Sequence, residues 1–139
     1  MSARQRGVLG VVGTGADGVE ALRTGLVEPA LARGRRVAVT LTPTAGRRLR
    51  ANGEAALLER LTGLPVRDTP RLPGEPRPHP DADCYVVAPA TANTLAKLAL
   101  GIADNQALTQ LAEALGIPEV PVVAFPRPAI LTTLDHATH

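Results

Sequence analysis

The sequence predicts an α/β fold, in which helices cover both faces of a parallel sheet. Short apolar runs, too short to form helices, alternate with longer segments whose apolar residues recur at helical spacing. Turns rich in glycine, threonine and proline join these segments, as in strand–helix units. The 139 residues are 45% hydrophobic and include one tyrosine and one phenylalanine, so we expect one domain with a core of small aliphatic side chains.

The first strand–helix unit begins with a predicted buried strand at residues 7–12. A helix is expected over residues 19–30, where Pro29 should kink or end it. The turn Gly13-Thr14-Gly15 would let the backbone approach a phosphate closely, with the Thr14 hydroxyl as an added donor. Such turns also serve simply as tight connections, so this motif alone leaves both interpretations open.

The second unit begins with a predicted strand at residues 37–41 and continues into the turn Thr42-Pro43-Thr44. The hydroxyls of Thr42 and Thr44 could donate to a phosphate, and Thr44 could also cap the short helix that follows. Both interpretations are compatible, because a helix N-terminus is itself an anion-binding feature. A further helix is expected at residues 54–61.

Residues 66–82 are predicted to form a proline-rich loop. Prolines recur from residue 65 to residue 80, so neither a long helix nor a central strand can persist there. Val66 and Arg67 are expected to form a brief edge strand, and the rest could be a lid or an interface arm. His79 lies near the end of this loop.

The segment at residues 83–105 contains the polar turn around which the site is predicted. Residues 84–88 should form a buried strand that Pro89 ends. Thr91, Asn93 and Thr94 then supply side chains that favour a helix start. The unpaired N–H groups and the dipole at that N-terminus favour an anionic or electron-rich ligand.

A last unit completes the predicted sheet. Asp104 is expected to cap a helix, and residues 120–125 should form the final parallel strand. Right-handed crossovers then give a flavodoxin-like or Rossmann-like three-layer sandwich with the strand order 3-2-1-4-5. In this order residues 13–15 and 89–94 face one crevice, with residues 42–44 beside it.

Three sequence motifs carry a family resemblance. They are Pro89-Ala-Thr-Ala-Asn-Thr94, Ala96-Lys97 and Gly101-Ile-Ala-Asp-Asn105. Together they resemble the signature of the homo-oligomeric flavin-containing cysteine decarboxylases. The resemblance implies an FMN cofactor. The residues that it places around the FMN are Gly13, Thr14, Gly15, Thr42, Thr44, Pro89, Ala90, Thr91, Asn93 and Thr94.

The resemblance also implies oxidative decarboxylation of a cysteine-containing small molecule or peptide C-terminus, with His79 and Asn93 as catalytic residues. This sequence departs from the family pattern at two positions, which leaves an alternative to this activity open. The family's histidine is expected at the position of Glu75, and Pro126-Arg-Pro-Ala-Ile130 replaces its Pro-Ala-Met-Asn clamp. The alternative is an inactive FMN-binding regulatory or interaction subunit, or another FMN-dependent redox enzyme of this fold.

Composition and charge limit the remaining functions. The net charge is +2, and the basic cluster at residues 47–50 is interpreted as a solvated helix face, so no nucleic-acid partner is expected. No apolar segment is long enough to span a membrane. The single Cys84 fits a reducing cytoplasm, and no metal site is expected. We expect residues 1–139 to be one FMN-binding domain that assembles as a homotrimer or dodecamer. The resemblance leaves open whether the family's C-terminal part is missing.

Overall fold

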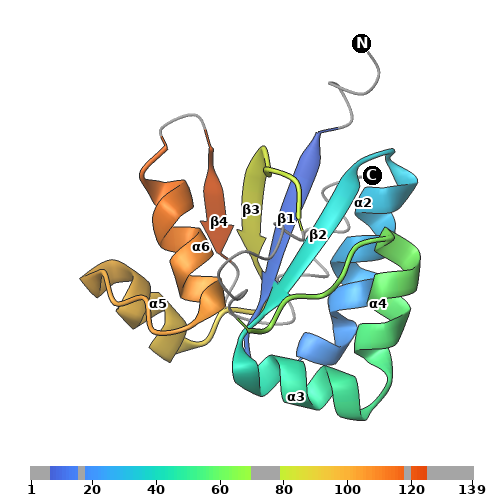
Figure 1. Cartoon of the computed structure of the whole chain (residues 1–139), viewed down its shortest axis with the longest axis horizontal. Helices are drawn as coiled ribbons and strands as arrows, with labels where there is room; N and C mark the ends of the chain where they lie inside the picture. Colours follow the sequence, from blue (N-terminus) through green and yellow to red (C-terminus); the bar gives the residue numbers. More distant parts are fainter. Residues whose placement is uncertain (1–6, 16–17, 70–78, 118–119, 125–139) are drawn as a thin grey trace, which may run out of the picture.

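The computed structural model describes residues 7–15, 18–69, 79–117 and 120–124, which form a parallel sheet covered by helices (Figure 1). Its four strands lie in the order β2-β1-β3-β4, and every neighbouring pair is parallel. The strands are β1 (Val8–Gly13), β2 (Arg36–Leu41), β3 (Cys84–Val87) and β4 (Val122–Ala124). The predicted parallel sheet flanked by helices is confirmed.

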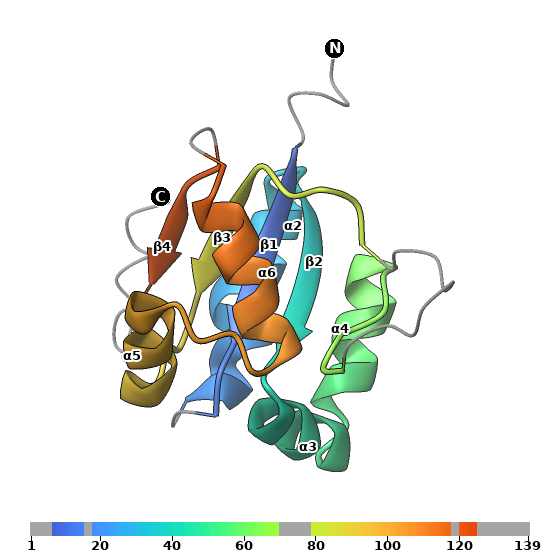
Figure 2. The same ribbon diagram turned by 60° about the vertical axis from the view of Figure 1, so that its left-hand side comes forward.

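The helical elements connect these strands and lie around the sheet. Figure 2 shows α6 on one face of the sheet and α2 on the other. The elements are η1 (Val19–Ala21), η2 (Arg23–Val27), α2 (Glu28–Ala32), α3 (Pro43–Ala51), α4 (Glu54–Thr62), α5 (Ala92–Leu100) and α6 (Gln106–Leu115). None of the helices in the described ranges is long and apolar enough to cross a membrane.

The predicted count of five strands is wrong, because the segment at Val66 and Arg67 contributes only one bridge. Arg67 pairs in parallel with Thr40 of β2, and the Arg67 N–H donates to the Val39 carbonyl at 3.1 Å. Pro65 has no N–H with which to extend the ladder, so pairing starts late. This bridge lies beyond β2, where the predicted order placed the third strand.

The first helical segment also differs from the single helix that the sequence predicts. It consists of the 3₁₀ turn η1, the π-type segment η2 and the short helix α2 in succession. Pro29 lies in the first turn of α2. Because a proline has no N–H, the carbonyl four residues earlier lacks an α-helical partner, which suits the wider winding of η2. Pro29 therefore alters the winding without ending the segment.

Two apolar clusters stabilise the fold. The larger one joins β1 and β2 to the helical segments that follow them, and it includes the fully buried Leu22, Leu49 and Leu58. The smaller one lies under α6 and includes Val87 and Leu111. Burial of these side chains is the main favourable term that holds the strand ends in place.

Replacing Leu58 with alanine should lower the free energy of unfolding by about 2–5 kcal/mol, because Leu58 is fully buried and the change leaves a cavity. Leu61, on the same helix α4, is 44% exposed, so Leu61→Ala should stay within about 0.5 kcal/mol of the wild type. Urea unfolding of both variants measures the difference. Equal destabilisation by the two changes would contradict this packing.

Candidate functional site

A pocket of about 430 Å³ opens at the carboxyl ends of β1, β2 and β3. Three turns and the loop between α5 and α6 line it. The lining residues are Gly15, Thr42, Pro43, Thr44, Thr91, Asn93, Thr94, Lys97, Asp104 and Asn105. The structure thus brings together the three turns that the sequence predicted to converge.

Thr14 lies behind the pocket wall, where it links two of these turns. It is fully buried, and its hydroxyl donates to the Pro89 carbonyl at 2.6 Å and accepts from the Thr91 N–H at 2.9 Å. The backbone N–H of Thr14 also donates to Pro89 at 3.2 Å. In this structure the hydroxyl predicted to donate to a phosphate instead joins the end of β1 to the turn after β3.

Gly13 is the last residue of β1 and does not line the pocket. A Cβ atom there would lie 2.9 Å from Leu41 Cδ2, so the residue is packed against the core. Pro89 and Ala90 are likewise buried and shape the turn from behind. Gly15 does line the pocket, and a Cβ atom there would lie 2.9 Å from Thr44 Cγ2. Glycine thus lets the first turn approach the second closely.

The N-terminus of α3 forms one side of the pocket. Thr42 is the N-cap, since its hydroxyl oxygen accepts from the Ala45 N–H at 3.4 Å; the suggested cap at Thr44 is wrong. Thr44 lies two residues further along the chain and is exposed. Pro43 has no N–H, so the Thr44 N–H is the first-turn donor left without an intrahelical acceptor. The Thr42 N–H donates to Gly13, which fixes this helix to β1.

The N-terminus of α5 forms the facing side. The Thr91 hydroxyl caps it by accepting from the Thr94 N–H at 3.0 Å and donates to the Thr94 hydroxyl at 2.8 Å. The N–H groups of Ala92 and Asn93 have no intrahelical acceptor at this position. Asn93 is exposed, and no hydrogen bond from other described residues occupies its side-chain amide.

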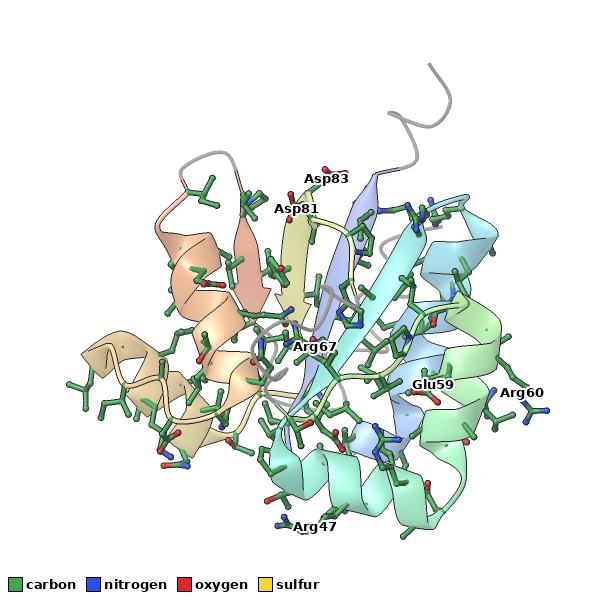
Figure 3. The ribbon with its side chains drawn as sticks, in the orientation of Figure 1. Arg47, Glu59, Arg60, Arg67, Asp81 and Asp83 are labelled. Carbon is green, nitrogen blue, oxygen red and sulfur yellow. The ribbon has the colours of Figure 1, made fainter. Side chains whose placement is uncertain are left out.

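Two helix N-termini therefore face one pocket, and both dipoles favour a negatively charged group there. A second pocket, of about 540 Å³, lies beside α6 and is lined in part by Asp81, Tyr85 and Glu113. Its two carboxylates disfavour an anion. Figure 3 shows Asp81 and Asp83 at the end of the sheet away from Arg47 of α3. The pocket between α3 and α5 is thus the better site for a phosphate.

Lys97 and Asn105 line the pocket without a role assigned from the sequence, and Asp104 was expected only to cap the helix that follows. Lys97 donates to Asp104 at 2.7 Å, and Asn105 caps α6 by accepting from the Leu108 N–H at 2.9 Å. The predicted cap at Asp104 is therefore wrong by one residue. The spacing of Asn93 and Lys97, four residues apart on a helix, was the available signal that both share one face.

His79 does not line this pocket. It is buried beside the chain that follows α4, where its Nε2 is hydrogen-bonded to the Pro65 carbonyl. Burial lowers the pKa of His79 below its usual value of 6.5; the bond to Pro65 opposes this, and the positive charge of Arg67 adds to it. The neutral form of the ring is therefore favoured at pH 7, and the histidine is not among the residues that line the pocket.

A family model described as Flavoprotein matches residues 6–134. The chain belongs to the flavoprotein family. The family membership predicted from the motif at residues 89–94 is thus confirmed. The match extends over both helix N-termini of the pocket and over the strands that carry them.

Solved structures of other flavoproteins share the fold. DmrB of Burkholderia xenovorans, described as a cubic protein cage for redox transfer, has a TM-score of 0.64 and 27% identity over 86% of this chain and 67% of that chain. DmrB has also been crystallised with FMN. The cypemycin decarboxylase CypD has a TM-score of 0.60 and 25% identity over 95% of this chain and 76% of that chain.

One curated relative matches a shorter segment. It is MJ0730, an uncharacterized protein of Methanocaldococcus jannaschii, and it is 52% identical over 44 residues. The match covers 32% of this flavoprotein and 23% of MJ0730. It therefore bears on a local segment, and the whole-chain comparison rests on the family model and the solved structures.

The role of Thr14 can be tested by replacing it with valine and with serine. Thr14→Val should lower the free energy of unfolding by about 1–3 kcal/mol, because it leaves the partly buried Thr91 N–H without an acceptor. Thr14→Ser keeps the hydroxyl and should retain most of the stability. Amide hydrogen exchange at Thr91 should accelerate only in the valine variant, and equal protection of Thr91 in both variants would contradict the link.

The lowered pKa of His79 predicts a loss of stability in acid. Below about pH 6.5 the unfolded chain binds a proton at this histidine more readily than the folded chain, so the free energy of unfolding falls as the pH is lowered, by at most about 1.4 kcal/mol per pH unit. His79→Gln removes this titration. Its stability difference between pH 7 and pH 5, measured in urea, should be smaller than that of the wild type; an unchanged difference would refute the assignment.

Proposed function

We propose that this flavoprotein binds FMN in the pocket between α3 and α5 and oxidatively decarboxylates a cysteine-containing small molecule or peptide C-terminus. The observation that carries the proposal is the convergence of two helix N-termini and the open amide of Asn93 on one pocket. Its volume of about 430 Å³ lies within the range of small-ligand pockets.

The residues present fit a phosphorylated flavin. Gly15, Thr42 and Thr44 would hold the phosphate through the first turn of α3, where backbone donors and the dipole favour an anion. The turn that precedes α5, with Thr91 and Asn93, would contact the ring system. When bound, the flavin would accept two electrons from the substrate.

The protein's own groups would orient the substrate rather than carry the redox chemistry. The Asn93 amide has two donors and one acceptor oxygen, so it can contact both a carboxylate and a flavin edge. Lys97 and Asp104 are the ionisable side chains among the described residues of the pocket lining. His79 remains a proposed proton carrier only if another arrangement of its loop brings it to the pocket.

A second candidate function is FMN binding without decarboxylation, as a redox or carrier protein. The position of His79, which is hydrogen-bonded to Pro65 and absent from the pocket lining, favours it. The replaced clamp at residues 126–130 lies outside the described residues. DmrB, which is described as a cage for redox transfer, shares this fold at 27% identity.

We also propose that the chain assembles as a homo-oligomer, as a trimer or a dodecamer. Leu100 on α5 is 75% exposed, and Ile102 and Val123 are 44% and 46% exposed. Leu100 and Ile102 lie two residues apart at the end of α5, and exposed apolar side chains that cluster in this way commonly mark an interface between subunits. The cage described for DmrB supports an assembly of this kind.

Purification followed by visible spectroscopy tests FMN binding, and incubation with a peptide ending in cysteine tests the reaction. A yellow protein that removes carbon dioxide and two hydrogens from the peptide, as measured by mass, is the expected result. Asn93→Asp should weaken both FMN binding and turnover, because its added negative charge faces the ligand in the pocket.

A matching peptide that ends in serine serves as the control and should remain unchanged, because it lacks the thiol. Yellow protein with an unchanged cysteine peptide would support the second candidate function. Colourless protein that takes up no added FMN would refute both functions.

A further inference from the structure

The wall of the pocket contains an ion pair to which the proposed binding of FMN assigns no role. Lys97 Nζ lies 2.7 Å from Asp104 Oδ2, and these are the charged side chains among the described lining residues. In a pocket with two helix N-termini, a fixed carboxylate opposes an anionic ligand. The pair therefore raises the question of what Lys97 binds when a ligand is present.

Helix geometry places Lys97 beside the part of the pocket that Asn93 lines. The two residues are four apart on α5 and so share a face, one turn after the N-terminus. An oxyanion lying near the Asn93 amide would thus be within the region that the flexible lysine side chain sweeps. Lysine suits this purpose, because its ammonium is a compact charge on a long, rotatable stem.

Asp104 has no competing role in the described structure. Asn105, and not Asp104, caps α6, and the Asp104 carboxylate accepts a hydrogen bond from Lys97. The Asp104 side chain is 53% exposed and that of Lys97 is 28% exposed. Ion pairs this exposed contribute little to stability, because water solvates the separated charges well. Lys97 can therefore leave Asp104 at little cost.

We propose that Lys97 is an exchangeable cation of this pocket, which releases Asp104 and binds an oxyanion of the incoming ligand. The inference rests on the proposed function, in which the ligand is FMN with its substrate. The oxyanion is the FMN phosphate or the substrate carboxylate, which share the same chemistry. Asp104 acts as an internal competitor that occupies Lys97 in the unliganded pocket.

The two partners of the ion pair should behave oppositely when each is neutralised. Lys97→Met removes the cation and should weaken binding of the oxyanion by about tenfold, whereas Asp104→Asn removes the competitor and should strengthen it by about twofold to fivefold. A pair that only links α5 to α6 predicts the same direction for both variants, because both break the same contact.

Titration with FMN and with riboflavin, followed by flavin fluorescence, tests whether the oxyanion that Lys97 binds is the FMN phosphate. If Lys97 binds the phosphate, the opposite shifts appear for FMN and not for riboflavin. If it binds the substrate carboxylate, they appear in the KM for a cysteine-ended peptide acid and not for the same peptide as its amide. Opposite shifts in one arm support the proposal.

Thermal unfolding of the flavin-free protein in inorganic phosphate supplies a readout independent of the flavin. Phosphate that binds the folded state raises the melting temperature. The rise should be largest for Asp104→Asn, intermediate for the wild type and smallest for Lys97→Met. Arg50→Met is the matched control, because it removes one positive charge and an ion pair to Asp68 outside the pocket lining. It should respond like the wild type.

Failure of the wild type to bind FMN would refute the proposed function, and the phosphate series would still decide the role of Lys97. Shifts in the same direction for both pocket variants would overturn the proposal. The proposal would also be overturned if neither pocket variant differed from Arg50→Met in flavin titration, in the KM for the peptide or in thermal unfolding with phosphate.

Discussion

The buried hydroxyl of Thr14 is the contact on which the arrangement of the pocket depends. It donates to Pro89 and accepts from Thr91, and so joins the end of β1 to the turn that starts α5. The neighbouring Gly13 carbonyl accepts from the Thr42 N–H and fixes the start of α3 to the same strand. The N-termini of both helices are thus hydrogen-bonded to the end of β1. This keeps the positive ends of their dipoles directed at the same pocket.

The fold was accessible from the sequence because its signals are local and repeated. The apolar runs at residues 7–12, 37–41 and 84–88 are too short for helices and so predicted strands, and the rule of right-handed crossovers then gave their order around β1. The strand β3 is less buried than predicted, since only Val87 of its four residues is fully buried. The predicted third strand was wrong, because the segment at Arg67 makes a single bridge. Whether such a segment pairs depends on its tertiary neighbours and on the missing N–H of Pro65. Caps were predicted within one or two residues, since threonine at 42 or 44 satisfies the same pattern.

The roles of individual site residues were less accessible. The sequence placed Thr14 in the correct turn, but a hydroxyl that faces the neighbouring turn and one that faces a phosphate have the same sequence pattern. His79 lies close in sequence to the central strand, yet in the structure it is buried beside Pro65 and does not line the pocket. The pairing of Lys97 with Asp104 spans a helix end and a loop, so spacing alone did not reveal it. Fold and cofactor class thus follow from motifs, whereas chemistry depends on these side chains.

A crystal structure of the protein with FMN bound would test most directly whether the pocket between α3 and α5 holds the flavin. We expect the phosphate beside Gly15 and the first turn of α3, and the ring system against the turn that Thr14 ties to β1. The hydrogen bonds from Thr14 to Pro89 and from Thr91 to Thr14 should persist in the complex. A flavin in the second pocket, beside Asp81 and Glu113, or a phosphate bound directly by the Thr14 hydroxyl, would contradict this expectation.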